Sequence, residues 1–328
     1  MKRLIIALGI VPALFIAGFA LGAELRISKQ YGLNYLPLIV LEQHKILEKN
    51  AKAAGLGELV TSWTTLAGGA AANDALLSGS VDIIALGVPP FIRLWDKSKG
   101  QAKALVPLSE FAPSLTTNNP DVKTFKDFTD KDRIALPAVK VSLQTLLLQM
   151  AAAKEYGLAG HDRFDRLTVT MSHPDALLAL TSGKSEITGH FTQEPFLSAE
   201  LKHPGIHVVL DGYDVLGAAT YQVLAASTKF YTQNTKLAEV VVQSVKEADA
   251  WIAANPREAA ELYVKAAKSK ESPAEILTML QNPHAGYSIT PKKTTAFSAF
   301  LHEVKAIGNK PADWKELYFP PVHAEPGS

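Results

Sequence analysis

Residues 64–91 read TTLAGGAAANDALLSGSVDIIALGVPPF, and an altered copy, MSHPDALLALTSGKSEITGHFTQEPF, occupies residues 171–196. Each copy runs through an Ala/Leu-rich segment to Ser-Gly, then to an acidic residue (Asp82 or Glu186) and β-branched residues, and ends in Pro-Phe. Glycine ends a helix in the left-handed conformation without strain, and a β-branched run suits a buried strand. Each copy therefore predicts a helix, a glycine stop, a strand and a loop, and the repeat predicts two similar lobes.

Composition limits the possible functions. The chain has 328 residues, enough for two ordinary domains, and 47% of them are hydrophobic. Its 33 basic and 32 acidic residues give a net charge of +1. This balance argues against nucleic-acid binding, which needs a clustered basic excess. Because the sequence has no cysteine, disulfides, thiolate metal sites, Cys nucleophiles and lipid attachment through an amino-terminal Cys are excluded.

The amino terminus has the order of a secretory signal. Lys2 and Arg3 precede an apolar run over residues 4–21, which small residues follow. We expect a signal peptide over residues 1–23, cleaved after Gly22 or Ala23, and a periplasmic location. The alternative is an uncleaved membrane anchor, since this run is near the minimum length of a membrane span.

Beyond residue 24, short strands alternate with longer helical segments. This alternation predicts an α/β fold with mainly parallel sheets and flanking helices. Ligands bind such sheets beyond the carboxyl ends of the strands. The loops that matter are therefore those at residues 30–35, 64–69, 87–90 and 138–142.

The same pattern divides the chain into lobes. We expect lobe one to contain residues 24–106 plus 213–319 and lobe two residues 107–212, joined by two crossings near residues 110–130 and 211–216. In lobe two, Ser142 is the expected N-cap and Gly157 the stop of a helix over residues 143–156. A 3.6-residue apolar period predicts another helix over residues 235–254. Residues 320–328 are expected to form a mobile tail.

Four blocks of the chain resemble a known family. They are ALLSGSVDIIALGVPPF, PAVKVSLQTLLLQMAAAKEYGL, HPDALLALTSGKSEITGHFTQEP and VVQSVKEADAWIAANPREAAELY. In this order and spacing they resemble the periplasmic substrate-binding proteins of ABC importers in the nitrate, sulfonate and taurine group, which are related to the NMT1/THI5-like thiamine-precursor proteins. The resemblance implies a type II periplasmic binding fold, with a small-molecule ligand held between two lobes and an ABC permease as partner.

The chain departs from that family at one block. Members often have a tryptophan before the proline, whereas here residues 190–195 read HFTQEP. This departure leaves the ligand open: a small anionic or zwitterionic sulfonate, taurine or carboxylate, or a thiamine-precursor-like pyrimidine. An enzyme of the pyrimidine-synthase type is less expected, because those enzymes use a cysteine-rich segment. A sensor subunit remains an alternative to a transport component.

The candidate ligand-binding residues lie in the loops that the fold aims at the cleft. Free N–H groups at a helix start favour an anion, a lysine adds charge, and aromatic and amide side chains stack or form hydrogen bonds. Each also has an ordinary structural role, as a turn, a solvated charge or a surface tyrosine. The candidates are Tyr31, Asn34, Tyr35, Leu66, Gly68, Gly69, Gly87, Val88, Lys140, Val141, Ser142, Gln193, Glu194 and Tyr213.

Other chemistry finds no support in the sequence. His203 and His207 are four residues apart, but Pro204 and Gly205 between them preclude the helical face that a two-histidine metal site needs. The hydrolase and nucleotide motifs are also missing. We therefore expect no cofactor, no catalytic residues and no nucleic acid, and a monomer that binds a small molecule.

Overall fold

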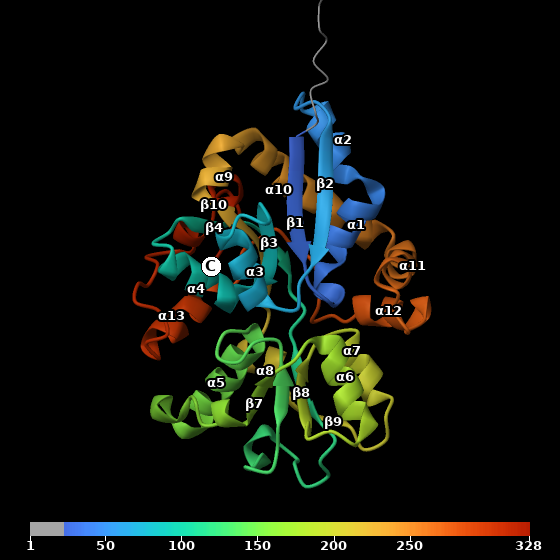
Figure 1. Ribbon diagram of the computed structural model, residues 1–328, viewed down its shortest axis with the longest axis vertical. Coiled ribbons are helices and arrows are strands. Elements are labelled where there is room, and N and C mark those ends of the chain that lie inside the picture. Colours follow the sequence, from blue (N-terminus) through green and yellow to red (C-terminus); the bar gives the residue numbers. More distant parts are fainter. Residues whose placement is uncertain (1–22) are drawn as a thin grey trace, which may run out of the picture.

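The computed structural model describes residues 23–328, and its strands form two separate five-stranded sheets (Figure 1). The predicted signal peptide, except Ala23 at the start of the first strand, lies outside the described residues. Within residues 23–328 no helix combines the length and apolarity that crossing a bilayer requires.

Lobe one is built on the first sheet, which has the order β2-β1-β3-β10-β4. Strands β2, β1 and β3 are parallel, and β10 is antiparallel to both of its neighbours. Four of the five strands therefore run in one direction. The strands are β1 (Ala23–Lys29), β2 (Leu59–Thr65), β3 (Ile83–Gly87), β4 (Ala102–Ser109) and β10 (Gln222–Ser227).

Lobe two repeats this plan in its sheet, which has the order β7-β6-β8-β5-β9. Here β5 is antiparallel to both neighbours, while β7, β6 and β8 are parallel. In both sheets the opposed strand is the first one after the chain has crossed from the other lobe. The strands are β5 (Ser114–Thr117), β6 (Ile134–Leu136), β7 (Thr168–Thr170), β8 (Gly189–Thr192) and β9 (His207–Asp211).

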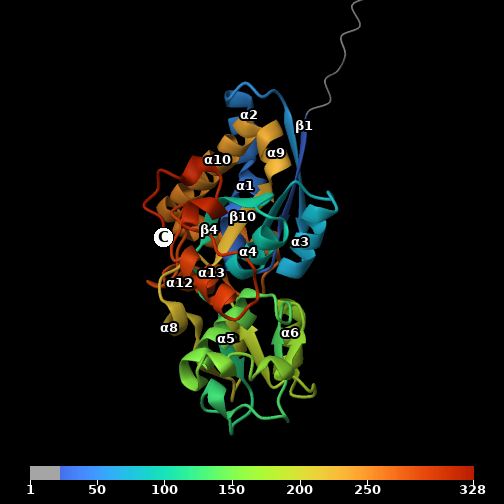
Figure 2. The ribbon, with the colours of Figure 1, turned by 90° about the vertical axis from the view of Figure 1, so that its left-hand side faces the viewer.

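Helices flank both sheets, and the lobes lie one above the other along the long axis (Figures 1 and 2). Lobe one carries α1 (Leu36–His44), α2 (Ile46–Ala53), α3 (Gly69–Leu77), α4 (Val88–Lys97), α9 (Thr228–Gln233), α10 (Thr235–Ala254), α11 (Pro256–Ala267), α12 (Pro273–Leu280) and α13 (Thr294–Glu303). Lobe two carries α5 (Leu143–Tyr156), α6 (His173–Ser182) and α7 (Phe196–Leu201), and α8 (Gly212–Leu216) lies in the second crossing.

The sequence repeat corresponds to matching elements of the two lobes. The first copy forms α3 and β3, and the second forms α6 and β8. Gly79 and Gly183 follow the two helices with φ of 72° and 62°, the left-handed conformation that glycine tolerates. The predicted order of helix, glycine stop and strand is confirmed. The helices over residues 143–156 and 235–254 are confirmed as well.

Three expectations differ from the structure. Residues 88–90, expected as part of a loop, form the first turn of α4, a position that suits proline. The first crossing is shorter than residues 110–130, because β4 continues to Ser109 in the first sheet and β5 begins at Ser114 in the second. The tail over residues 320–328 is packed rather than free. Val322 is fully buried, and the Ser328 carbonyl accepts a hydrogen bond of 2.8 Å from the N–H of Thr294.

Candidate functional site

A small cavity lies between the lobes, at the ends of strands from both sheets. Its volume is about 20 Å³, close to one water-sized sphere. The lobes of this structure are therefore closed on each other. Lobe one contributes Gln30, Tyr35, Gly69, Gly87, Pro90 and Gln222 to the cavity wall, and lobe two contributes Pro137, Ser142, Leu143, Gln144, His173 and Gln193.

Direct contacts between the lobes hold this closed state. The Gln193 amide donates to the Tyr31 carbonyl at 2.7 Å, and the N–H of Leu33 donates to the Glu194 carbonyl at 2.8 Å. A Cβ on Gly87 would lie 3.1 Å from the Cβ of Leu143. A side chain at this position would press on Leu143, which would have to move by a few tenths of an ångström.

Two helix starts reach the cavity from opposite lobes. Helix α3 begins after Gly68, which has no side chain to cap it, so the N–H groups of its first turn have no side-chain partner. Helix α5 is capped by Ser142, whose hydroxyl accepts from the N–H of Thr145 at 3.2 Å. The N–H groups of Leu143 and Gln144 are left for other partners. Both helix dipoles thus direct their positive ends at one space.

Glutamine amides supply most of the remaining polarity. Gln30 donates to the Ala85 carbonyl at 2.8 Å, as Gln193 does to Tyr31, and the Gln222 carbonyl oxygen accepts from the Ser109 hydroxyl at 2.6 Å. These bonds fix the amides before a ligand arrives. Tyr35 adds a phenol, and burial raises its pKa above the ordinary value, so it stays a neutral hydroxyl. No lysine, arginine, aspartate or glutamate of residues 23–328 lines the cavity.

A chain of buried polar side chains extends from the cavity into lobe two. Gln144 Nε2 lies 3.3 Å from His173 Nε2, and His173 Nδ1 lies 2.8 Å from His190 Nε2. His190 Nδ1 is hydrogen bonded to the Glu200 carboxylate, which also accepts from the Thr116 hydroxyl at 2.6 Å. Burial, with a smaller contribution from His190, lowers the pKa of His173 well below its ordinary value, so that its ring is neutral.

Six of the residues predicted from sequence line the cavity or close against it. Tyr35, Gly69, Gly87, Ser142 and Gln193 line it. Gly68 lies directly against lobe two, since a Cβ on it would be 3.1 Å from Pro137. The sequence analysis missed Gln30, Gln144, His173 and Gln222. Each is an ordinary polar residue, and only the meeting of the two sheets brings these side chains together.

Three predicted contacts have side chains directed elsewhere. Lys140 has φ of 63° and is exposed, in a surface hollow that it shares with Asp162 and Asp165. The Glu194 carboxylate accepts from the N–H and hydroxyl of Ser198, and burial raises its pKa. Tyr213 stacks on His284 with ring centroids 3.9 Å apart. As the structure stands, these groups do not line the cavity.

The other candidates support the site without lining it. Tyr31 offers only its carbonyl to the closed interface, and its side chain lines a groove beside the cavity. Asn34 is buried and donates to the Phe111 carbonyl at 3.0 Å. Backbone bonds already use the N–H groups of the remaining candidates, which are Leu66, Val88 and Val141.

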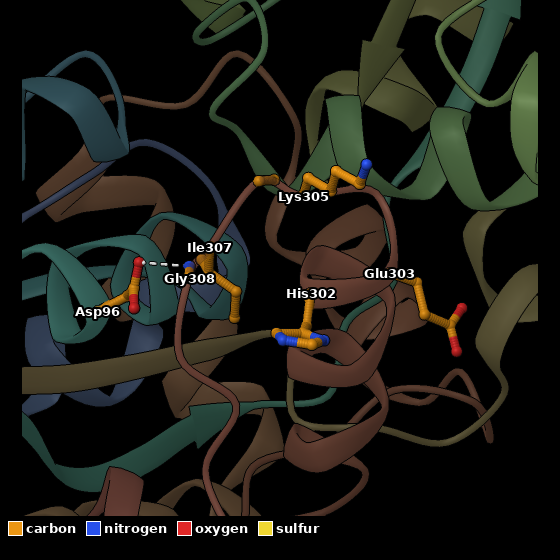
Figure 3. Close-up of a pocket in the computed structure, with 7 residues that line it drawn as sticks. Asp96, His302, Glu303, Lys305, Ile307 and Gly308 are labelled. Atoms are coloured by element: carbon orange, nitrogen blue, oxygen red, sulfur yellow. Dashed lines mark hydrogen bonds between the residues drawn. The ribbon is translucent and has the colours of Figure 1, made fainter.

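Several larger hollows lie outside the cavity, and two of them border helices of lobe one. A groove of about 740 Å³ opens between α6 and α7 of lobe two and α11 of lobe one. Another, of about 610 Å³, lies in lobe one where the segment after α13 passes α4 (Figure 3). There the Asp96 carboxylate accepts from the N–H of Gly308 at 3.0 Å and of Asn309 at 2.8 Å. These bonds tie the segment to α4, which is a structural role.

Residues 23–328 contain no group of three or more His, Asp or Glu side chains placed to hold a metal ion. The buried histidines of lobe two are instead bonded to each other and to Glu200. The site can therefore bind a ligand through hydrogen bonds from uncharged groups, namely backbone N–H groups, glutamine amides and the Tyr35 hydroxyl.

Comparison with solved structures gives the fold. The alkanesulfonate-binding protein SsuA from Xanthomonas axonopodis pv. citri, bound to MOPS, is 18% identical, with a TM-score of 0.71 over 90% of this chain and 98% of that one. The aliphatic sulphonate-binding protein SsuA from Escherichia coli is 21% identical, with a TM-score of 0.66 over 90% and 97%. The nitrate-binding protein NrtA from Synechocystis PCC 6803 is 15% identical, with a TM-score of 0.70 over 90% and 84%. The two-lobed periplasmic binding fold predicted from sequence is confirmed.

Sequence comparison gives the family. No curated protein matches the chain. The model of the NMT1-like family matches residues 24–267, a span that includes both copies of the repeat and every residue lining the cavity. The chain therefore belongs to the NMT1-like family.

Proposed function

We propose that this protein is the solute-binding component of an ABC import system and captures a small organic anion or zwitterion between its lobes. The observation that carries the proposal is the meeting of two helix starts, α3 and α5, at one inter-lobe cavity that no carboxylate of residues 23–328 lines. Each start stabilises a negative head by about 0.3 to 1 kcal/mol when exposed and up to about 2 when partly buried. The sulfonate and nitrate ligands of the structural neighbours agree with this class.

The geometry changes how the anion is expected to be held. Lys140 is absent from the cavity wall and lies instead in a surface hollow with Asp162, Arg163, Asp165 and Arg166. We therefore expect the head to be bound by backbone N–H groups and neutral side chains. Buried dipoles are screened little by salt. We expect affinity to change little with ionic strength and Lys140→Ala to leave it unchanged.

A ligand panel tests the proposal. Calorimetry and thermal shift with ethanesulfonate, taurine, nitrate, benzoate and a neutral aminopyrimidine should show binding of at least one anion, because a ligand that binds only the folded state raises its stability. Binding of the pyrimidine alone would exclude the anion class.

The glutamines favour a second candidate, a neutral heterocycle with N–H donors. The N–H groups of Gln30 and Gln193 are bonded to backbone carbonyls, which leaves their carbonyl oxygens as acceptors. A pyrimidine carrying an amine would match such acceptors. The same panel separates the two candidates.

Incubation with each compound and analysis for product tests the enzyme alternative, since turnover would contradict a pure receptor.

We propose further that the two crossings act as a hinge. Opening breaks the bonds of Gln193 to Tyr31 and of Leu33 to Glu194, and a ligand that touches both lobes favours closure.

In this proposal the protein works in the periplasm as a monomer, delivers its ligand to a membrane permease, and loses its signal peptide. Small-angle scattering with and without ligand tests closure, and mass spectrometry of the exported protein tests cleavage.

A further inference from the structure

The hydrogen-bonded chain of buried side chains behind the cavity has two possible arrangements, which differ in which atom of each bond is the donor. Its members are Gln144, His173, His190 and Glu200, and both histidines and the glutamate are at most 4% exposed. A neutral imidazole carries one hydrogen on its two nitrogens, so each ring donates on one side and accepts on the other. The direction at one end of the chain therefore fixes the direction at the other.

In the first direction, every bond points toward Glu200. The Gln144 amide donates to His173 Nε2, His173 Nδ1–H donates to His190 Nε2, and His190 Nδ1–H donates to the carboxylate. The Gln144 carbonyl oxygen is then left for the cavity. This arrangement matches the placement of Nε2 of Gln144 beside the ring.

The second direction requires one more proton. A proton from solvent adds to His173 Nε2, and the proton on His173 Nδ1 passes to His190 Nε2. His190 then carries both hydrogens and forms an ion pair with Glu200, while His173 is neutral as before. Because His173 Nε2 now donates, the Gln144 amide rotates so that its oxygen accepts and its NH₂ group faces the cavity.

We propose that binding of an anionic solute is coupled to uptake of one proton by the Glu200–His190–His173 chain, which turns the Gln144 NH₂ group toward the solute. The inference rests on the proposed function and deepens it. A solute anion would enter a cavity that no lysine or arginine of the described part of the chain lines, on the same side as the buried Glu200 carboxylate, and two buried like charges are costly. The added proton removes this repulsion and adds a donor, so Gln144 is a specificity-determining residue.

The surroundings of the chain favour proton uptake. Glu194, at the start of α7, interacts with Glu200 and with Glu271, and Asp175 lies in the first turn of α6. Lys202, the residue directly after α7, pairs with Glu275 at 2.7 Å. Phe196 stacks on His173, and exposed His203 follows α7. The groups packed around the chain thus carry excess negative charge.

Calorimetry measures the coupling directly. Heats of binding for the tightest anion of the panel, compared in phosphate and Tris, give the number of protons taken up. We expect about one proton for the wild type, and an affinity that rises as the pH falls by up to about tenfold per unit. Glu200→Gln places a donor beside His190 Nδ1 and fixes the second direction without a charge, so uptake should vanish while the anion still binds.

The matched control is Glu194→Gln, which changes a half-buried carboxylate on the same segment that is bonded to Ser198 rather than to the histidines. This variant should still take up one proton, although at a somewhat lower pH than the wild type, because one of the surrounding negative charges is removed. No uptake by the wild type, or equal uptake by Glu200→Gln and the wild type, would overturn the proposal.

Nitrogen NMR of the ligand-free protein separates this proposal from the proposed function. As the pH is lowered over the range in which the protein stays folded, the hydrogen of His173 should move from Nδ1 to Nε2. If no anion binds but this move occurs, the ligand class is wrong and the chain behaves as inferred. If anions bind and His173 keeps one tautomer throughout, with and without ligand, the coupling is wrong.

Discussion

The two lobes share one strand order but differ in the polarity of two matching positions. Gly69 and Leu86 of lobe one stand, at the same offset within the repeat, where His173 and His190 stand in lobe two. In lobe one a Cβ on Gly69 would lie 3.9 Å from the Cβ of Leu86, and in lobe two the histidines are bonded at 2.8 Å. The comparison teaches that the apolar pattern specifies the lobe, while a few substitutions within it specify what the lobe presents to a ligand.

The largest effect is expected from giving lobe two the residue of lobe one. His190→Leu leaves the Glu200 carboxylate buried with only Thr116 as partner, and removing one member of a buried pair costs about 3 to 5 kcal/mol. The free energy of unfolding, from urea denaturation, measures the loss. The double variant His190→Leu, Glu200→Leu should recover part of it, because no unpaired charge remains. A loss below about 1 kcal/mol for the single variant would show that the chain contributes little to folding.

Gly69→Ala tests the corresponding position in lobe one. The new Cβ would lie 2.6 Å from Pro90 Cγ, so either the start of α3 or Pro90 must shift, and both belong to the cavity wall. We expect solute affinity to fall at least about tenfold, or about 1.4 kcal/mol. Gly286→Ala is the control, since a Cβ there meets nothing within 4 Å. Equal affinity for both variants would contradict a role of α3 in binding.

Much of this fold was predictable because it follows from local chemistry. Each feature that was predicted correctly depends only on residues close together in the sequence. Examples are the Ser-Gly stops, the N-cap at Ser142 and the apolar period of α10. Strand β5 was not expected, because its four residues, SLTT, lie in a Pro- and Asn-rich segment and pair only with distant strands. The chain through His173 and His190 escaped prediction for the same reason, since those residues meet through strand pairing and not through spacing.

The error over Lys140 has a specific cause. The sequence places it beside the start of α5, but its backbone is left-handed and the residue lines a surface hollow, with Asp162, Arg163, Asp165 and Arg166, instead of the cavity. Position along a chain does not determine direction in a loop. The direction in which each glutamine side chain points at the cavity is set by its hydrogen bonds to distant residues, and the sequence does not show these bonds.

A smaller effect is expected at the caps of the two facing helices. Helix α5 has a side-chain cap at Ser142, whereas α3 has only Gly68. Ser142→Ala should lower the free energy of unfolding by about 1 kcal/mol, and Ser142→Gly by only a few tenths. Thermal denaturation of both variants measures the difference. If they are equally stable, the cap does not explain the conformation of this loop.

The smallest effect is expected where the lobes are joined rather than where they differ. Lys202, directly after α7, pairs with Glu275 of α12, and hydrogen bonds from Lys202 and Ser272 lower the pKa of Glu275 from 4.5 to about 2. A lowered carboxyl pKa stabilises the protein above its unfolded value, and this contribution is lost as the pH falls from 4.5 toward about 2. Because the pair is exposed, Lys202→Gln should have a small, salt-sensitive effect. An acid-unfolding midpoint unaffected by the variant would show that the pair does not couple to stability.

The most direct test of the central claim, that a solute is held by both lobes at once, is amide NMR during a ligand titration. The account predicts that the N–H signals of Ala70 and Ala71 at the start of α3, and of Leu143 and Gln144 at the start of α5, shift together and saturate at one ligand per chain. Shifts confined to one lobe, or to Leu177 and Phe196 in the neighbouring groove, would contradict it.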